Sequence, residues 1–443
     1  MDLERFMFLW HRVMSSEDIK IKSYAMDKLL FELDSENTQT RNFTVSALEK
    51  ALSHIIKEKM EFELSYIKDR LYEKIKYQLL PAGILKDCSL LLNIISLEMI
   101  RQQKFEETHE ILLEYNVRLS PEAAHPQEVK KIAQDFIREV SNESTLAVLI
   151  SQIKEGVSFQ RIKLIEEILE CMDKNKVAEK LTDIFTVDDR TARMRALRVL
   201  NRLGKSSVSA LFALLSNPGT FLRKKGTAIL VDEQWYKVRN AIYVLGNIPE
   251  NESICTLSKL NQDPDIRVRL DVVKALERIG RPESVDVLLT FLNDGEDEVR
   301  RSALRSLSML DDRRCLKPLM EYFRQSHKDK ILTLAAIGNI GKEESISFLL
   351  GLIWEKEKGI GHLTSKQRDE IKVVVLNILG KIGSPELTSE IEKFVKQRGK
   401  GVINLLVKDK VLESAKRALR MIKDRNKGHT RSLQENVSVE REA

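Results

Sequence analysis

The sequence predicts an all-α protein: an α-solenoid of stacked helical hairpins, preceded by an irregular helical N-terminal module. The 443 residues include only 18 glycines and 9 prolines, and 32% of them are charged, a composition that favours helices. A unit of about 31 residues recurs along the chain, and its apolar residues follow helical spacing. We expect three parts: a module at 1–125, a solenoid at 126–425 and a disordered tail at 426–443.

The N-terminal module lacks the repeat but is still predicted to be helical. Residues 40–80 contain no glycine or proline, so they form either one long helix or two. The helices of 1–125 pack as an irregular bundle or as divergent repeats. A dimerising coiled coil is a further alternative, although the heptad pattern is broken. The oligomeric state therefore stays open.

The solenoid prediction depends on repeated segments. Residues 263–280 read DPDIRVRLDVVKALERIG, and residues 294–311 read DGEDEVRRSALRSLSMLD. We identify about eight such units between residues 126 and 398. A single hairpin cannot bury its apolar face, whereas a row of hairpins covers each face with the next unit.

Within each unit the residues predict two helices joined by a turn. Gly280 and Gly341 stand where a first helix must stop, and glycine adopts the left-handed conformation required there. Asp311 takes the corresponding place in another unit and tolerates the same conformation. These positions predict where the first helices end.

An arginine follows a valine near the start of several first helices. We assign Arg269 and Arg300 a structural role, in which they pair with Asp265 and Asp297 at helical spacing. Such pairs contribute only about 0.3–0.5 kcal/mol each when they are exposed.

These motifs carry a family resemblance over about 270 residues. The segments VRRSALRSLSML (299–310), VRNAIYVLGNI (238–248) and LAAIGNIGKEESISFLLGLI (334–353) resemble the HEAT-like repeats first noted in phycobilisome-lyase proteins. The resemblance implies an α-solenoid whose first helices lie on the convex side and whose second helices lie on the concave side. Val238-Arg239 comes one residue late, and Lys330-Ile331 replaces Val-Arg, so this chain departs from the pattern twice.

Two insertions interrupt the period, at 217–233 and 355–366. Loops on a rigid scaffold often carry function, but a tolerated surface insertion explains them equally well. Residues 227–231 could form a short hairpin or strand. The role of both insertions stays open.

No catalytic pattern stands out. None of the seven histidines has metal-ligand spacing, and His109-Glu110 is a lone His-Glu pair. No phosphate-binding loop or nucleophile elbow is present. We therefore predict a non-enzyme with no catalytic residues, metal or cofactor. A lyase or hydroxylase of the HEAT-like kind is the alternative, and fold analogy alone is a weak argument for it.

One column of the repeat suggests a protein-binding surface. The second helices carry large apolar residues where the family usually has alanine, and together they would form a ribbon for an apolar helix or peptide. The alternative is that they fill space between adjacent second helices. The predicted ribbon comprises Leu214, Leu260, Phe291, Tyr322 and Leu352.

The basic C-terminal end is a second candidate. Residues 393–427 hold twelve Lys and Arg against three acidic residues, and Lys416, Arg417, Arg420 and Lys423 cluster on a predicted last helix. Such a patch attracts nucleic acid, an acidic protein or a membrane surface, but it has no aromatic residues for base stacking. A solvated capping helix is the alternative.

The remaining features predict a soluble cytoplasmic protein. The net charge is +6, too small for a general case for nucleic acid. The four cysteines are far apart and are expected to be reduced and mostly buried. No signal peptide or membrane span is recognised. The function most consistent with the sequence is a non-catalytic scaffold or adaptor that binds another protein, whose identity the sequence does not reveal.

Overall fold

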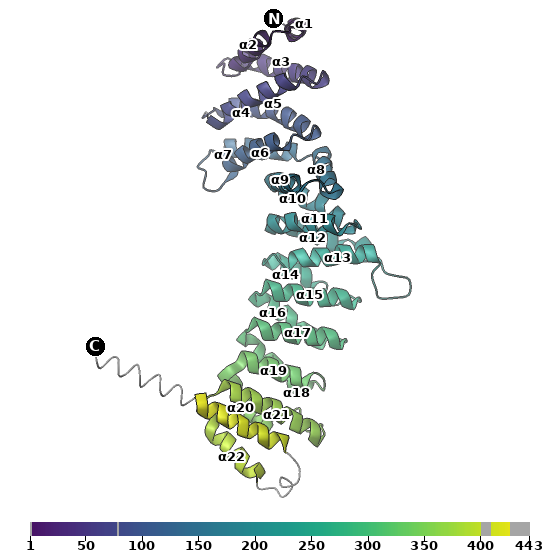
Figure 1. Ribbon diagram of the computed structural model, residues 1–443, viewed down its shortest axis with the longest axis vertical. Coiled ribbons are helices and arrows are strands. Elements are labelled where there is room, and N and C mark those ends of the chain that lie inside the picture. Colours follow the sequence, from purple (N-terminus) through teal and green to yellow (C-terminus); the bar gives the residue numbers. More distant parts are fainter. Residues whose placement is uncertain (1, 78, 400–408, 426–443) are drawn as a thin grey trace, which may run out of the picture. The chain divides into compact units, whose positions relative to one another are not determined.

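The computed structural model describes residues 2–77, 79–399 and 409–425, and Figure 1 shows that the elements along these ranges are helices. No strand occurs in the described ranges, and an isolated bridge joins Arg223 to Leu230 in the first insertion. The predicted fold class, an all-α solenoid of helical hairpins, is confirmed. The tail predicted at 426–443 lies outside the described residues.

The helices form two compact units, Met1–Thr220 and Phe221–Ala443, which we describe separately. This boundary falls within the first insertion, whereas the sequence suggested a change of character near residue 125. The N-terminal module therefore shares a compact unit with the first predicted repeats. The predicted division into parts at 1–125, 126–425 and 426–443 stays a prediction.

The N-terminal unit is a series of helix pairs in which α1, α3, α5 and α7 contact one another in order. The 40–80 stretch forms two helices, which separate at Lys59 with a φ of 56°. The module thus continues the hairpin pattern in a divergent form. Its helices are α1 (Leu3–Met14), α2 (Ile19–Glu32), α3 (Thr38–Lys57), α4 (Glu61–Tyr77), α5 (Ala82–Arg101), α6 (Phe105–Leu119), α7 (Gln127–Val140), α8 (Glu143–Glu155), α9 (Phe159–Cys171), α10 (Lys174–Thr182), α11 (Arg190–Leu203) and α12 (Val208–Ser216).

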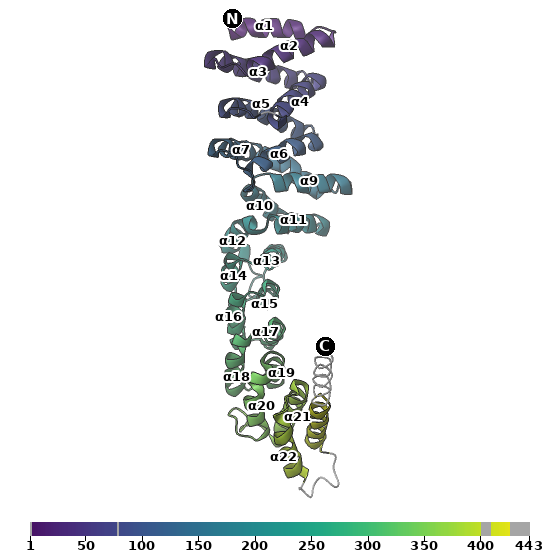
Figure 2. The same ribbon diagram turned by 90° about the vertical axis from the view of Figure 1, so that its left-hand side faces the viewer.

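The C-terminal unit is more regular from α13 to α20, where Figure 2 shows the first helices in one layer and the second helices in another. The first helices α13, α15, α17, α19 and α21 contact their neighbours in order. A further helix covers 410–425. The numbered helices are α13 (Asp232–Leu245), α14 (Asn251–Ser258), α15 (Ile266–Ile279), α16 (Pro282–Thr290), α17 (Asp297–Leu310), α18 (Leu316–Gln325), α19 (Lys330–Gly341), α20 (Ile346–Ile353), α21 (Ser365–Ile382) and α22 (Leu387–Gly399).

The predicted helix ends are partly confirmed. Gly280 and Asp311 adopt left-handed conformations, with φ of 63° and 50°. The first helix does end at Gly341, as predicted, but the left-handed conformation predicted for this glycine is wrong, because Lys342 takes the positive φ. A Cβ on Gly341 would lie 2.6 Å from a methyl group of Leu316, so close packing explains this glycine.

The core lies between the two helix layers. Val268, Leu276 and Val299 are completely buried, and each such side chain contributes about 1.5–3 kcal/mol relative to exposure. Cys88, Cys171 and Cys315 are buried free thiols, whereas Cys255 is exposed. In the described ranges, every helix is too short or too polar to cross a membrane.

The arginines of the Val-Arg pairs join successive units. Arg269 bonds to Asp294 of the next loop at 2.7 Å and to the carbonyl of Asp263 at 2.6 Å. Its predicted pairing with Asp265 is therefore wrong, because the side chain reaches forward along the stack. Arg300 does pair with Asp297, and it also reaches Asp329 at 3.3 Å. These contacts form an Arg–Asp ladder along the edge where first helices begin.

Candidate interaction surfaces

The predicted apolar ribbon does not form a continuous surface. Leu260, Phe291 and Leu352 are 7%, 2% and 0% exposed, so they belong to the core. Leu214 and Tyr322 are half-buried. Phe291 starts a 3-10 turn that packs against α17, which explains why a large residue at this position turns inward. Leu260, Phe291 and Leu352 therefore fit the alternative interpretation, in which the side chains fill space between adjacent helices.

The predicted basic patch lies on the helix at 410–425. Lys416, Arg417, Arg420 and Lys423 are all exposed. Lys423 pairs with Glu392 of α22 at 2.6 Å, which reduces the charge that this residue offers to a partner. Binding at this patch stays a prediction.

A surface that sequence reasoning missed lies on α2 and α4, and we call it the α2–α4 surface. Its members recur at helical spacing on the side of each helix opposite the core. Tyr24 is 65% exposed, Phe31 70% and Tyr77 74%. The signal in the sequence was that α2 and α4 carry apolar residues on both faces. The surface comprises Ile21, Tyr24 and Phe31 of α2 with Phe62, Tyr66 and Tyr77 of α4.

The two helices of this surface are held together. Helices α2 and α4 contact each other, and the hydroxyl of Tyr66 donates a hydrogen bond to Asp27 of α2 at 2.9 Å. The rings of Phe62 and Tyr66 lie 6.0 Å apart. The aromatic side chains therefore stand on a fixed support.

Cations accompany the rings of the α2–α4 surface. Lys28 lies 5.7 Å from the ring centre of Tyr24, Arg70 lies 5.3 Å from that of Tyr66, and Lys76 lies 5.3 Å from that of Tyr77. Electrostatic interaction with Tyr72, followed by a hydrogen bond to Tyr77, raises the pKa of Lys76. Arg70 is also ion-paired with Asp27 at 3.4 Å and with Glu73 at 3.7 Å, so Lys28 and Lys76 supply the positive charge beside the apolar groups.

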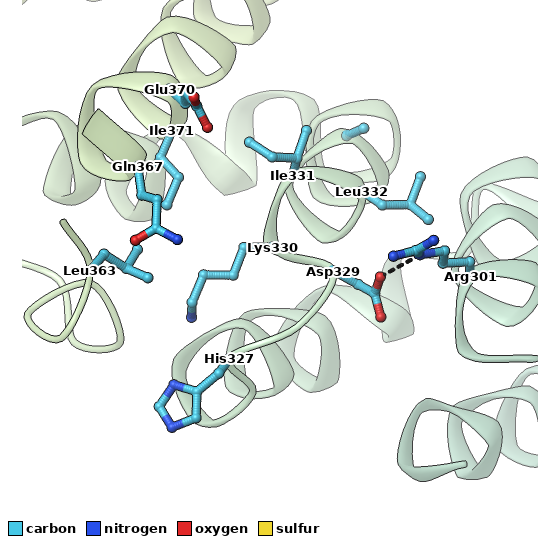
Figure 3. A pocket seen from close by; sticks show the side chains of 11 residues that line it. Arg301, His327, Asp329, Lys330, Ile331, Leu332, Leu363, Gln367, Glu370 and Ile371 are labelled. Atoms are coloured by element: carbon cyan, nitrogen blue, oxygen red, sulfur yellow. Dashed lines mark hydrogen bonds and ion pairs between the residues drawn. The ribbon is translucent and has the colours of Figure 1, made fainter. Parts of the chain in front are cut away.

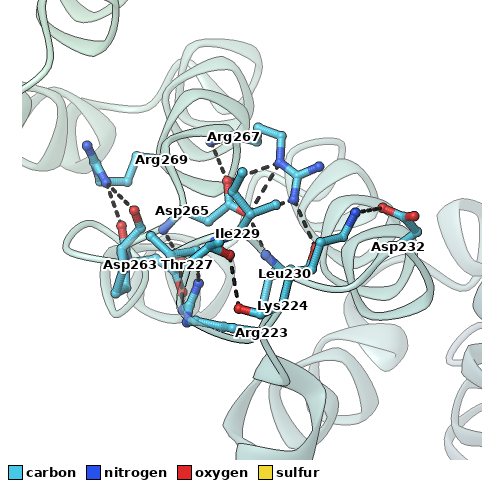
Figure 4. A network of polar contacts seen from close by, with 12 residues as sticks. Arg223, Lys224, Thr227, Ile229, Leu230, Asp232, Asp263, Asp265, Arg267 and Arg269 are labelled. Carbon is cyan, nitrogen blue, oxygen red and sulfur yellow. Dashed lines mark hydrogen bonds and ion pairs between the residues drawn. The ribbon is translucent and has the colours of Figure 1, made fainter.

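The first insertion is not a loose loop (Figure 4). Arg223 pairs with Asp263 at 2.9 Å, and the buried Leu230 donates its N–H to Asp265 at 2.9 Å. Arg267 also binds Asp265, at 2.7 Å. Burial raises the pKa of Asp265, but its bonds to Arg267 and the Leu230 N–H outweigh burial and hold that pKa below its ordinary value. Arg223 therefore extends the Arg–Asp ladder by one position.

The second insertion is also anchored. Arg324 pairs with Glu357 at 3.1 Å, and Ile360 is buried. A Cβ on Gly359, which has a φ of 93°, would lie 2.7 Å from the Arg324 backbone. His362 lies 2.7 Å from His327, measured between Nε2 and Nδ1. Through Leu363 the insertion also borders a pocket beside α19 and α21.

Within the described ranges, no group of three or more His, Cys, Asp or Glu side chains is arranged to hold a metal ion. The absence of a metal, a cofactor and an enzymatic activity remains a prediction.

Comparison with known proteins identifies the repeats. Residues 224–308 match the family model described as HEAT repeats, so the resemblance that the motifs predicted is confirmed for this segment. No curated protein matches the chain.

Solved structures similar to the chain include an engineered protein, with 19% identity, a TM-score of 0.30, and coverage of 90% of this chain and 98% of the other. Importin beta has 14% identity and a TM-score of 0.34, with coverage of 92% and 54%, so this chain spans about half of its length. The CpcE–CpcF complex of phycocyanin lyase from Nostoc sp. PCC7120 has 16% identity and a TM-score of 0.24, with coverage of 60% and 94%.

Proposed function

We propose that this HEAT-repeat protein is a scaffold or adaptor that holds a protein partner on the α2–α4 surface. HEAT solenoids are typical of protein-interaction scaffolds. The observation that carries the proposal is the exposure of Tyr24, Phe31 and Tyr77, at 65%, 70% and 74%. Contiguous exposed apolar groups mark interaction sites, and aromatic residues dominate binding energies at interfaces.

The chemistry of the surface specifies the partner. Its apolar groups would pack against an apolar face of the partner, such as one side of an amphipathic helix. Lys28 and Lys76 beside the rings favour carboxylates on the flanks of that face. We therefore propose an apolar protein segment with acidic borders.

The experiment compares partner capture from native lysate by three full-length chains: wild type, the double variant Phe31→Asp/Tyr77→Asp, and the control Met309→Asp. Met309 lies on α17 and is 74% exposed, so the control adds a charge at an equally exposed apolar site elsewhere. We expect the double variant to lose a partner that the control retains. Equal capture by all three chains would contradict the proposal.

The alternative of nucleic-acid binding at the basic patch is distinguished by salt. Nucleic-acid affinity falls steeply as salt rises, because binding releases counterions. Capture on the α2–α4 surface is mainly apolar and should persist. A partner that is lost at moderate salt and on replacing Lys416, Arg417 and Arg420 by Gln would favour the alternative.

A further inference from the structure

A pocket in the C-terminal unit lies between α19, α21 and the second insertion (Figure 3). Its volume is about 510 Å³, within the range of about 300–1,000 Å³ typical of small-molecule sites. Ile331, Leu363 and Ile371 form apolar parts of its wall, and Lys330, Gln367 and Glu370 contribute polar groups. The pocket therefore combines an apolar lining with a few polar side chains.

Lys330 differs from every other buried charge in the described structure. Nine charged residues are buried there, and eight of them have an ion-pair partner of opposite sign. Lys330 is only 6% exposed and has no carboxylate partner. Buried charges are normally paired, because an isolated charge is costly in a low-dielectric interior.

The contacts of Lys330 satisfy only part of its ammonium group. The group donates one hydrogen bond, to the carbonyl of Phe323 at 2.6 Å, and lies 4.3 Å from the ring of Phe323. A lysine ammonium has three donors. The Phe323 carbonyl accepts a hydrogen bond from one of these donors, and it supplies no negative charge to balance the ammonium group. Figure 3 shows the side chain extending from the start of α19 toward His327.

Packing does not require a lysine at this position. Val268 and Val299 occupy the corresponding place in the two preceding units and are fully buried. A valine or methionine would therefore serve the core. The lysine introduces a charge where neighbouring repeats have none, beside a pocket large enough for a ligand.

The start of α19 adds to the positive potential. Asp329 precedes the helix with a φ of 56° and provides no side-chain cap. Its carboxylate binds Arg301 at 2.7 Å and Arg300 at 3.3 Å instead. The positive end of the helix dipole therefore stays uncapped by a side chain at the wall of the pocket.

We propose that this pocket binds a small carboxylate-bearing molecule with an apolar body, and that its carboxylate pairs with the Lys330 ammonium. The apolar body would lie against Ile331, Leu363 and Ile371. One uncompensated cation matches one negative charge, and the carboxylate of Glu370 in the same lining disfavours a dianion such as phosphate. The proposal is independent of partner binding on the α2–α4 surface.

The titration of Lys330 is consistent with this assignment. Burial lowers the pKa of Lys330 to about 8, and a bound carboxylate would raise it again. The other titratable or charged groups near the site are Arg301, His327, Asp329, His362 and Glu370. Desolvation, His327 and Lys330 lower the pKa of His362, so this imidazole is mostly neutral at pH 7.5. Carboxylate binding should therefore weaken as the pH rises through about 8 and Lys330 loses its proton.

The test measures binding of hexanoate, hexanamide and phosphate to the full chain at pH 7 by calorimetry and thermal shift. Hexanoate should bind and raise the melting temperature, whereas neutral hexanamide and phosphate should have little effect. In Lys330→Met the affinity for hexanoate should fall by about 10-fold or more, the value expected for a lost charge-assisted hydrogen bond. Lys328→Met, which alters an exposed lysine outside the pocket, should bind like wild type.

Four results would overturn the proposal, three of them measured on wild type and one on Lys330→Met. Wild type could fail to bind hexanoate, bind hexanamide equally well, or prefer phosphate. Equal hexanoate affinity in wild type and Lys330→Met would also reject Lys330 as the binding cation. The wild-type measurements decide the question even if the variant folds poorly.

Discussion

Helices α2 and α4 of the N-terminal unit differ from the second helices of the C-terminal unit in where they place large apolar side chains. In the N-terminal unit, α2 and α4 leave Tyr24, Phe31 and Tyr77 mostly in solvent. In the C-terminal unit, the described residues of α14, α16, α18 and α20 include no exposed large hydrophobic side chain. Large apolar side chains thus serve internal packing in the second helices of one unit and stay exposed on α2 and α4 of the other, where we propose that a partner binds.

The largest effect should come from placing the same substitution in both settings. Phe291→Asp puts a charge into a site that is 2% exposed, so we expect the free energy of unfolding of the C-terminal unit to fall by about 4 kcal/mol or more. Phe31→Asp, at 70% exposure, should change stability by no more than about 0.5 kcal/mol. Urea unfolding followed by circular dichroism measures both.

The same two variants can also contradict the difference between the exposed Phe31 and the buried Phe291. Similar losses of stability would show that Phe31 is part of the core, and the α2–α4 surface would then not be free for a partner. If Phe291→Asp were as stable as wild type, Phe291 would not be a core residue, and the predicted apolar ribbon would again be a candidate binding surface.

The next effect concerns the Arg–Asp ladder, which orders the C-terminal unit. Asp294→Asn removes the carboxylate that Arg269 reaches at 2.7 Å, and the Asp294 side chain is only 6% exposed. Breaking a buried ion pair costs about 3 kcal/mol, and we expect a loss of about 2–3 kcal/mol because Arg269 keeps its bond to the Asp263 carbonyl.

The control for the ladder is Asp286→Asn, because Asp286 is exposed on α16. This variant should unfold within about 0.5 kcal/mol of wild type. A cost for Asp294→Asn no larger than for the control would show that the ladder does not stabilise the stack.

The sequence predicted the hairpins because their information is local. Apolar spacing, terminal glycines and the recurrence of Val-Arg all lie within one unit of about 31 residues. The direction of the arginines was not predictable in this way, because both Asp265, about one turn before Arg269, and Asp294 in the next loop are possible partners, and the side chain binds Asp294. That choice depends on how units stack.

The candidate surfaces were harder to predict for a related reason. A column of large residues indicates burial and binding equally well until the neighbouring helix is placed. Phe291 and Tyr322 share a repeat position, yet one is buried and the other half-buried. The α2–α4 surface lies outside the regular repeat, so no column revealed it.

A moderate effect with a definite pH dependence is expected at Lys330. The unfolded chain keeps the Lys330 proton up to its ordinary pKa of 10.5, whereas in the folded chain burial lowers the pKa to about 8. The unfolded state therefore binds more protons between pH 8 and 10.5, and the stability of wild type should rise with pH across this window.

Lys330→Met should remove that pH dependence. Below pH 8 we expect the variant to be more stable by about 1–2 kcal/mol, because the desolvation cost disappears while one hydrogen bond is lost. The advantage should fade toward pH 10.5. Parallel pH profiles for wild type and variant would show that Lys330 is not the group that titrates.

The smallest effect tests the support of the α2–α4 surface. Tyr66→Phe keeps the ring beside Phe62 but removes the hydroxyl that donates to Asp27 at 2.9 Å. Because this bond is partly exposed, we expect a loss of about 0.5–1 kcal/mol in unfolding free energy. Partner capture should stay close to wild type, since the apolar ring is retained. A variant of normal stability that no longer captures the partner would mean that the partner hydrogen-bonds to the Tyr66 hydroxyl itself, and the surface would then be recognised by polar contacts as well as by apolar packing.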